Sequence, residues 1–163
     1  MVCGLGGHGK DTFCEILEDK FNLTFESSSR ASAPIVFDKI GEKYGYSDHI
    51  TCWADRRNHR EEWFEIIAAM NQEYPTTAKM LFDNYDVYCG CRSLKEFLMA
   101  KDHKLFQLSI WVDAGKRLPD VKDPSCQIRK EDCDVVVDNN GTIDDLYDTV
   151  ERIYNIYVRS SVA

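Results

Sequence analysis

The sequence predicts an α/β fold, with a short parallel sheet of about five strands between two layers of helices. Short apolar runs alternate with longer amphipathic stretches along the chain. This pattern is typical of parallel strands that helices cover on both faces. The chain has 163 residues, of which 44% are hydrophobic, so it is long enough to bury a core without metals or disulfides. Because we find no internal repeat or linker, residues 1–163 are expected to form a single domain.

The elements of the first third follow from apolar spacing and from residues that begin helices. Residues 1–3 form a very short apolar run before a glycine-rich loop, and apolar residues then recur at helical spacing as far as Phe21. Residues 23–25 are expected to form a short strand. A helix is expected over about 32–44, with Pro34 in its first turn.

The middle of the chain predicts a long amphipathic helix over 56–74. Its apolar face is expected to consist of Trp63, Ile66, Ile67, Met70 and Tyr74. A shorter helix over about 75–83 begins at Pro75, and residues 86–89 are expected to form a buried strand.

A capping signal begins the last third. Ser93 is a suitable N-cap, and Glu96 follows it at capping-box spacing, so a helix is expected to reach about residue 102. The remaining elements are expected in this order: strand 106–112, polar loop 115–131, strand 135–137, turn 138–141 and helix 143–157. The apolar residues of this last helix lie on one stripe, which predicts that it packs on the core.

Composition excludes several classes of protein. The net charge is −8, from 20 Lys and Arg against 28 Asp and Glu, which argues against broad nonspecific nucleic-acid binding but leaves room for a local basic patch. No apolar run approaches the ~18–20 residues of a membrane span. The first four residues do not resemble a secretory signal. Seven cysteines, without a CxxC pair, are expected to be reduced thiols in a cytoplasmic protein.

The sharpest motif is residues 4–12, GLGGHGKDT, which match GxxxxGK between a predicted strand and a helix. Glycines let successive backbone N–H groups point at phosphate oxygens, Lys10 reaches toward the outer phosphates, and the helix adds its positive end. The same segment satisfies GxGxxG, but a lysine at the helix start favours a triphosphate over a dinucleotide. The expected nucleotide-binding residues are Gly4, Gly6, Gly7, His8, Gly9, Lys10, Asp11 and Thr12, with Arg117 and Asn139 from later loops.

The residue after Lys10 departs from the usual pattern. That position normally holds Ser or Thr, whose hydroxyl binds Mg²⁺, but here it is Asp11, followed by Thr12, so both are candidate metal ligands. A carboxylate in this place also suits a neutral alcohol acceptor, which must lose a proton, whereas a phosphate acceptor needs no base. Asp11 and Glu26 are the candidate bases. The alternatives are a helix N-terminal carboxylate for Asp11 and a solvated loop acid for Glu26.

Basic and aromatic residues supply a candidate acceptor site. Three guanidinium groups begin the 56–74 helix, beside Trp53 and Trp63, which are suited to stacking on a base. A solvated helix start with salt bridges is the alternative. Arg92 directly follows a predicted strand, where a side chain faces a ligand at the sheet edge; an ordinary surface arginine is the alternative. The candidate substrate contacts are Ser28, Asp55, Arg56, Arg57, Arg60, Trp63 and Arg92, and the catalytic candidates are Lys10, Asp11, Glu26 and Arg92.

Two later loops are weaker candidates. Lys116 and Arg117 lie where kinases of this architecture keep a lid over the triphosphate, although a merely charged loop explains them as well. Asn139 and Asn140 end the last strand, where a base-binding loop is expected, but ordinary turn chemistry accounts for them equally.

Five segments together resemble a known group: GGHGKDT at 6–12, DRRNHREEW at 55–63, DVYCGCR at 86–92, IWVDA at 110–114 and DNNG at 138–141. They are similar to small bacteriophage P-loop kinases, which include deoxynucleoside monophosphate kinases and enzymes that phosphorylate 5-hydroxymethyluracil in DNA during thymidine hypermodification. The resemblance covers nearly the whole chain. It implies a three-layer P-loop kinase fold, ATP with Mg²⁺ as donor, a deoxynucleotide acceptor contacted by Arg57, Arg60 and Arg92, and a place in the host cytoplasm.

Two acceptors compete within this resemblance. Phosphorylation of the hydroxymethyl group of 5-hydroxymethyluracil in DNA is favoured by the compact chain, the modest lid loop, the carboxylate beside Lys10 and the local arginine cluster. A target base in a duplex would have to be flipped out or met single-stranded. A free deoxynucleoside monophosphate is favoured by the acidic total charge and by the same arginines as a phosphate clamp. A regulator that binds nucleotide without transferring phosphate is a third, weaker alternative.

Overall fold

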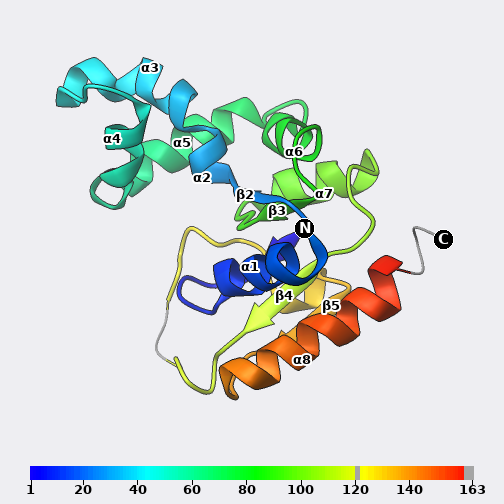
Figure 1. Ribbon diagram of the computed structural model, residues 1–163. Coiled ribbons are helices and arrows are strands. Elements are labelled where there is room, and N and C mark those ends of the chain that lie inside the picture. The colour runs from blue at the N-terminus through cyan, green and yellow to red at the C-terminus, as the bar shows by residue number, and fades with distance from the viewer. Residues whose placement is uncertain (120–121, 160–163) are drawn as a thin grey trace.

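The computed structural model describes residues 1–119 and 122–159 as a five-stranded, all-parallel sheet with helices on both sides (Figure 1). This confirms the predicted α/β class. The strand order is β2-β3-β1-β4-β5, so the first strand in the chain lies at the centre. The strands are β1 (Val2–Cys3), β2 (Phe25–Ser27), β3 (Val87–Cys89), β4 (Ile110–Asp113) and β5 (Val135–Asp138).

The helices connect these strands. Most of them were expected from apolar spacing, but several bounds differ from the predicted ranges. They are α1 (Lys10–Phe21), α2 (Ser28–Ala31), α3 (Ala33–Tyr44), α4 (His49–Ala54), α5 (Arg60–Met70), α6 (Thr76–Phe82), α7 (Leu94–Asp102) and α8 (Ile143–Ile153), with 3₁₀ turns at Arg56–His59 and Lys130–Asp132 and a π turn at Tyr154–Val158.

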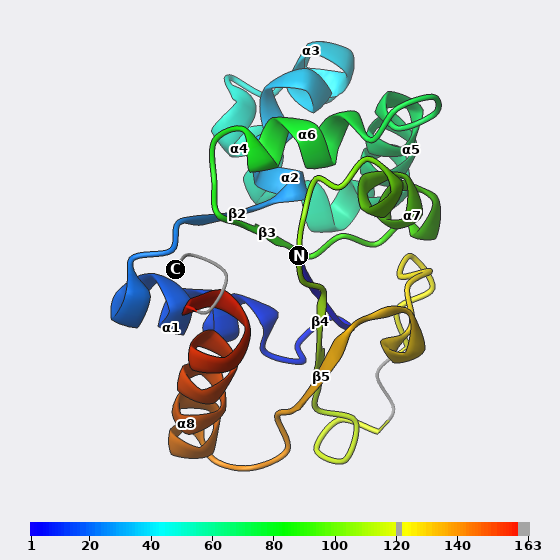
Figure 2. The same ribbon diagram turned by 90° about the vertical axis from the view of Figure 1, so that its right-hand side faces the viewer.

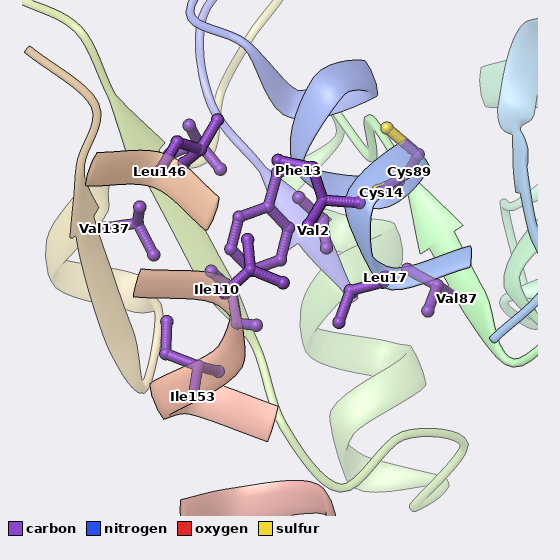
Figure 3. Packing of buried hydrophobic residues seen from close by; sticks show 13 residues of the cluster. Val2, Phe13, Cys14, Leu17, Val87, Cys89, Ile110, Val137, Leu146 and Ile153 are labelled. Atoms are coloured by element: carbon purple, nitrogen blue, oxygen red, sulfur yellow. The ribbon is translucent and has the colours of Figure 1, made fainter. Parts of the chain in front are cut away.

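The alternation of side chains along each strand divides the core into two layers. Val2 and Ile110 pack with α1 and α8, whereas Cys3 and Trp111, one residue later, pack with α6 and α7 on the other face. Figure 3 shows the first layer gathered around Phe13. Both layers consist of apolar side chains, which is why the strands are short apolar runs rather than alternating ones.

A third apolar cluster holds α3, α4 and α5 together, away from α8 (Figure 2). Its centre includes Val36, Cys52 and Trp63, all buried. This helical group follows β2 in the chain and therefore stands above the carboxyl edge of the sheet. The position matters for function, because ligands of open parallel sheets bind at that edge.

The predicted helix over 56–74 is wrong in its bounds. Asp48 and Thr51 form a capping box that begins α4, which was not expected. The chain then passes through a 3₁₀ turn before α5 starts at Arg60. At the other end, the Asn71 side chain donates to the carbonyl of Ile67 at 3.0 Å and ends α5 early. Tyr74 therefore lies outside the helix.

Three other expectations need correction. The strand expected at 23–25 is Phe25–Ser27, because Asn22 ends α1 in a left-handed conformation and shifts the register. The strand expected at 106–112 is shortened to Ile110–Asp113. The predicted stripe of the last helix is only partly core, since Ile143 and Tyr157 are 52% and 44% exposed.

Two expectations from composition, on the cysteines and on membrane spans, agree with the described residues. All seven cysteines are free thiols, and five of them are buried. The helices of the described part of the chain are too short or too polar for any of them to cross a bilayer.

Candidate functional site

The glycine loop follows the central strand and curls between β1 and α1. Gly4, Gly7 and Gly9 all have positive φ angles, of 147°, 76° and 92°. A Cβ on Gly4 would lie 2.6 Å from the carbonyl oxygen of Val112, and one on Gly9 would overlap the amide of Asn139. Only glycine satisfies both the backbone angles and the close approach. The loop is therefore wound tightly, as a phosphate-binding turn requires.

His8 and Asn139 hold the loop from behind. Nδ1 of His8 accepts the backbone N–H of Ala114 at 3.0 Å, and the Asn139 amide donates to the carbonyl of His8 at 2.9 Å. Burial lowers the pKa of His8, so the ring is neutral at pH 7. Arg117 supports the same corner, because its Nε donates to the carbonyl of Asn139 at 3.0 Å. These three expected nucleotide-binding residues thus shape the loop from outside the cleft.

Lys10 begins α1, and its side chain folds back over the loop. Its Nζ donates to the carbonyl of Leu5 at 2.8 Å, and the residue is only 8% exposed. The ammonium group is consequently held at the cleft wall beside Gly6 and Gly7. A cation in this place adds positive charge beside the backbone of the glycine loop.

One cleft of about 980 Å³ connects the loop with the helical group. It lies along the carboxyl ends of β1, β2 and β3, the edge at which parallel sheets bind ligands. The sequence-predicted residues that line it are Gly6, Gly7, Lys10, Asp11, Glu26, Ser28, Arg56, Arg57, Arg60, Trp63 and Arg92. Those outside its lining are Gly4, His8, Gly9, Thr12, Asp55, Arg117 and Asn139.

Three arginines form a cationic wall of this cleft. The described ion pairs involve Arg30 and Arg92, but none of those described involves Arg56, Arg57 or Arg60. Burial and the neighbouring charge of Arg57 lower the pKa of Arg56. Like charges gathered without a carboxylate partner indicate a place for an anion.

Trp53 organises this wall. The guanidinium of Arg56 lies 4.0 Å from the centre of the Trp53 ring and that of Arg30 lies 5.0 Å from it. The indole N–H of Trp53 donates to Ser29 Oγ at 3.3 Å. Trp63 is 4% exposed and packs in the helical cluster. Stacking of a base on either ring, as expected from sequence, would therefore require these arginines or helices to move.

Asp55, expected from sequence to contact the substrate, supports the local backbone. Its carboxylate accepts Tyr46 Oη and Asn58 Nδ2, both at 2.6 Å, and these bonds lower the pKa of Asp55. His59 also lies 3.2 Å from it. Asp55 thus holds the turn that presents the arginines to the cleft.

Two carboxylates stand on the cleft wall between the loop and the arginines. Glu26, at 21% side-chain exposure, accepts the backbone N–H of Ser27 at 2.7 Å and lies 3.6 Å from Nε of Arg30. Asp11 is exposed, and the thiol of Cys89 lies 3.6 Å from it. Glu26 is fixed by β2 beside Arg30. Asp11 follows Lys10 at the start of α1, and its charge also acts on the guanidinium of Arg56.

Asp11 suits magnesium, and Thr12 does not line the cleft. Mg²⁺ keeps several waters and is usually held by one or two carboxylates together with substrate phosphates. One exposed carboxylate beside the glycine loop meets that need. Within residues 1–119 and 122–159, no group of three or more His, Cys, Asp or Glu forms a metal site by itself.

The structure adds two acidic residues that sequence reasoning missed. Asp123 pairs with Arg92 beside the glycine loop. Glu96 lies at the cleft floor, where it accepts Tyr88 Oη at 3.0 Å and Asn71 Nδ2 at 3.2 Å. Glu96 was noticed only for its capping spacing, and Asp123 lies in a polar loop without periodicity. No local pattern predicts either contact.

Burial raises the pKa of Glu96 to about 7, against opposing hydrogen bonds from Tyr88 and Cys91. Because the folded state then holds the proton more tightly than the unfolded chain, this group favours folding most below its ordinary pKa of 4.5. We expect the free energy of unfolding to fall by roughly 3 kcal/mol as pH rises from about 4.5 to 7. Urea unfolding at several pH values measures this, and Glu96→Gln should flatten the profile. An equally steep profile in the variant would contradict the assignment.

Comparisons with known proteins do not name a family for this chain. No model of a known protein family matches it. A search of curated proteins likewise finds no significant relative.

Proposed function

We propose that this chain is an ATP-dependent kinase with a P-loop kinase fold, and that it phosphorylates the hydroxymethyl group of 5-hydroxymethyluracil in DNA. The observation that carries the proposal is the single cleft that joins three groups: the glycine loop with Lys10, two carboxylates, and arginines without acidic partners. In phosphoryl transfer to an alcohol, the glycine loop with Lys10 would bind the donor, a carboxylate would remove the proton, and the arginines would bind the acceptor.

The donor half of the cleft suits a triphosphate. The backbone of residues 4–9 turns inward through three positive-φ glycines, and Lys10 supplies a cation at the same place. Asp11 would hold Mg²⁺ at this end. When bound, the metal ion neutralises charge on the phosphate oxygens.

Glu26 is the proposed general base. Its carboxylate is oriented by Ser27 and Arg30 on the acceptor side of the cleft. It would take the proton of the hydroxymethyl group while the oxygen forms a bond to the γ-phosphorus and the bond from that phosphorus to the leaving ADP oxygen breaks. The phosphate acceptor of a monophosphate kinase would give such a carboxylate no proton to remove.

The arginine wall is the proposed DNA contact. Arg57 and Arg60 are exposed at the cleft, and none of the described ion pairs involves them. Phosphates that flank the modified base would bind there and bring the base toward Glu26. Extrusion of the base from a duplex, or a single-stranded substrate, is required because the carboxylate lies inside the cleft.

A free deoxynucleoside monophosphate is the second candidate acceptor. Glu15 and Glu18 of α1 also line the cleft and would repel a continuing DNA backbone on that side. A cleft of about 980 Å³ also falls within the size range of small-ligand pockets. In this case the arginine wall would clamp the acceptor phosphate itself.

A parallel assay distinguishes the two acceptors. Purified protein is incubated with γ-labelled ATP and Mg²⁺, and with DNA containing 5-hydroxymethyluracil, matched thymine DNA or a panel of free deoxynucleoside monophosphates. We expect label in the modified DNA alone. Label in a free nucleotide would establish the second candidate, and ATP binding without any transfer would favour a regulator.

Loss of the arginine wall should weaken acceptor binding. We expect Arg57→Gln with Arg60→Gln to raise KM for the DNA about tenfold and to reduce the dependence of DNA binding on salt, because fewer phosphates are contacted. KM for ATP should stay near the wild-type value. The control is Arg152→Gln, an exposed arginine in the last turn of α8. Equal DNA affinity in the double variant and the control would argue against this surface.

A further inference from the structure

Arg92 lines the cleft, but its guanidinium is paired with an acidic side chain of the loop that follows β4. Its Nη1 forms an ion pair with Asp123 and lies 2.8 Å from Ser125 Oγ. Ser125 Oγ in turn donates to the other carboxylate oxygen of Asp123 at 2.6 Å. The Asp123 side chain is only 7% exposed. These contacts form a compact cluster rather than a loose surface pair.

The same carboxylate reaches the phosphate loop. Oδ2 of Asp123 lies 3.6 Å from the position that a Cβ would take on Gly6. Burial opposes ionisation of Asp123, but the Ser125 hydroxyl, Arg92 and the Gly6 backbone outweigh it, so the pKa of Asp123 is lowered. An ionised carboxylate therefore lies between an amide of the glycine loop and a guanidinium. These donors are of the type that bind phosphate oxygens.

We propose that Asp123 is an internal substitute for a nucleotide phosphate, held in an anion site made by Gly6 and Arg92. A triphosphate that enters the loop displaces this carboxylate. Displacement frees Arg92, which then contacts the phosphoryl group in transfer. The inference rests on the proposed function, because it assumes that the loop takes a polyphosphate.

The ion pair between Asp123 and Arg92 couples the binding of ATP to the release of the Arg92 guanidinium. Before nucleotide binds, the positive charge of Arg92 is neutralised by Asp123, so the guanidinium is withheld from the acceptor side of the cleft. A polyphosphate carries more negative charge than one carboxylate and competes for the same donors. Asp123 thus lowers the affinity of the loop for ATP. Arg92 becomes available to the acceptor only after ATP has bound.

Calorimetric titration of the full chain tests the proposal with two probes, inorganic tripolyphosphate and ATP. We expect Asp123→Asn to bind both about tenfold more tightly than wild type, because the internal competitor has lost its charge. Asp123→Ala should behave in the same way, and it keeps the test valid if one variant does not fold. The control is Asp148→Asn, an equal change of net charge at an exposed position of α8.

The outcomes separate this inference from the proposed function. Wild type that binds tripolyphosphate, with unchanged or weaker binding by both Asp123 variants, would overturn the inference and leave the kinase proposal standing. Wild type and variants that all fail to bind either probe would instead overturn the kinase proposal. An equal gain in Asp148→Asn would show an effect of net charge alone, which also contradicts displacement. Finally, Arg92→Gln should remove most of the gain that Asp123→Asn produces.

Discussion

Lys10→Ala is expected to lower kcat for phosphoryl transfer by about 10²- to 10³-fold, the range found when one preorganised group that stabilises developing charge is removed. Lys10 is the cation that the structure holds against the glycine loop, through its 2.8 Å bond to the carbonyl of Leu5. Loss of that bond should cost about 1 kcal/mol of stability, too little to unfold the chain. Initial rates with labelled ATP, together with a thermal melt, measure both effects.

The matched control for this variant is Lys20→Ala in the last turn of the same helix. Lys20 pairs with Glu151 at 2.9 Å on an exposed surface and is not among the residues that line the cleft. Its removal should leave turnover unchanged, since exposed pairs contribute little. Near-normal turnover in Lys10→Ala would contradict the assignment of the glycine loop as the donor site, whatever the acceptor.

Glu26→Gln is expected to lower kcat by about 10²- to 10⁴-fold, the contribution of a positioned general base. KM for ATP should change little, because the carboxylate lies on the acceptor side of the cleft. Steady-state rates with ATP and acceptor varied in turn provide the measurement.

Asp11→Asn and Glu15→Gln complete this experiment. Asp11→Asn should act mainly on KM for MgATP, as expected of a residue at the metal end of the cleft. Glu15→Gln, a lining residue one turn along α1, should have little effect. A fall in kcat confined to Asp11→Asn would exchange the roles of the two carboxylates. Unchanged kcat in both Glu26→Gln and Asp11→Asn would contradict base catalysis and favour a phosphate acceptor.

Local patterns account for much of this structure. The glycine loop, its lysine and the helix after it were predictable because the positive φ angles of a tight turn demand glycine in fixed places. The parallel sheet was predictable from alternating apolar runs. The 56–74 helix was predicted with wrong bounds because the break at Asp55 depends on distant partners such as Tyr46, which no local spacing indicates.

By itself, the sequence determined the α/β class, the glycine-rich loop after the first strand and which basic and acidic side chains are available for a site. Only the tertiary structure decided that Arg57 and Glu26 line one cleft while Asp55 and Asn139 do not, and that Asp123 lies against the loop. The physical reason is that spacing along a chain determines which face of its own helix or strand a side chain occupies. The partner across the cleft is determined by the order of strands in the sheet and the return path of each loop, which are properties of packing.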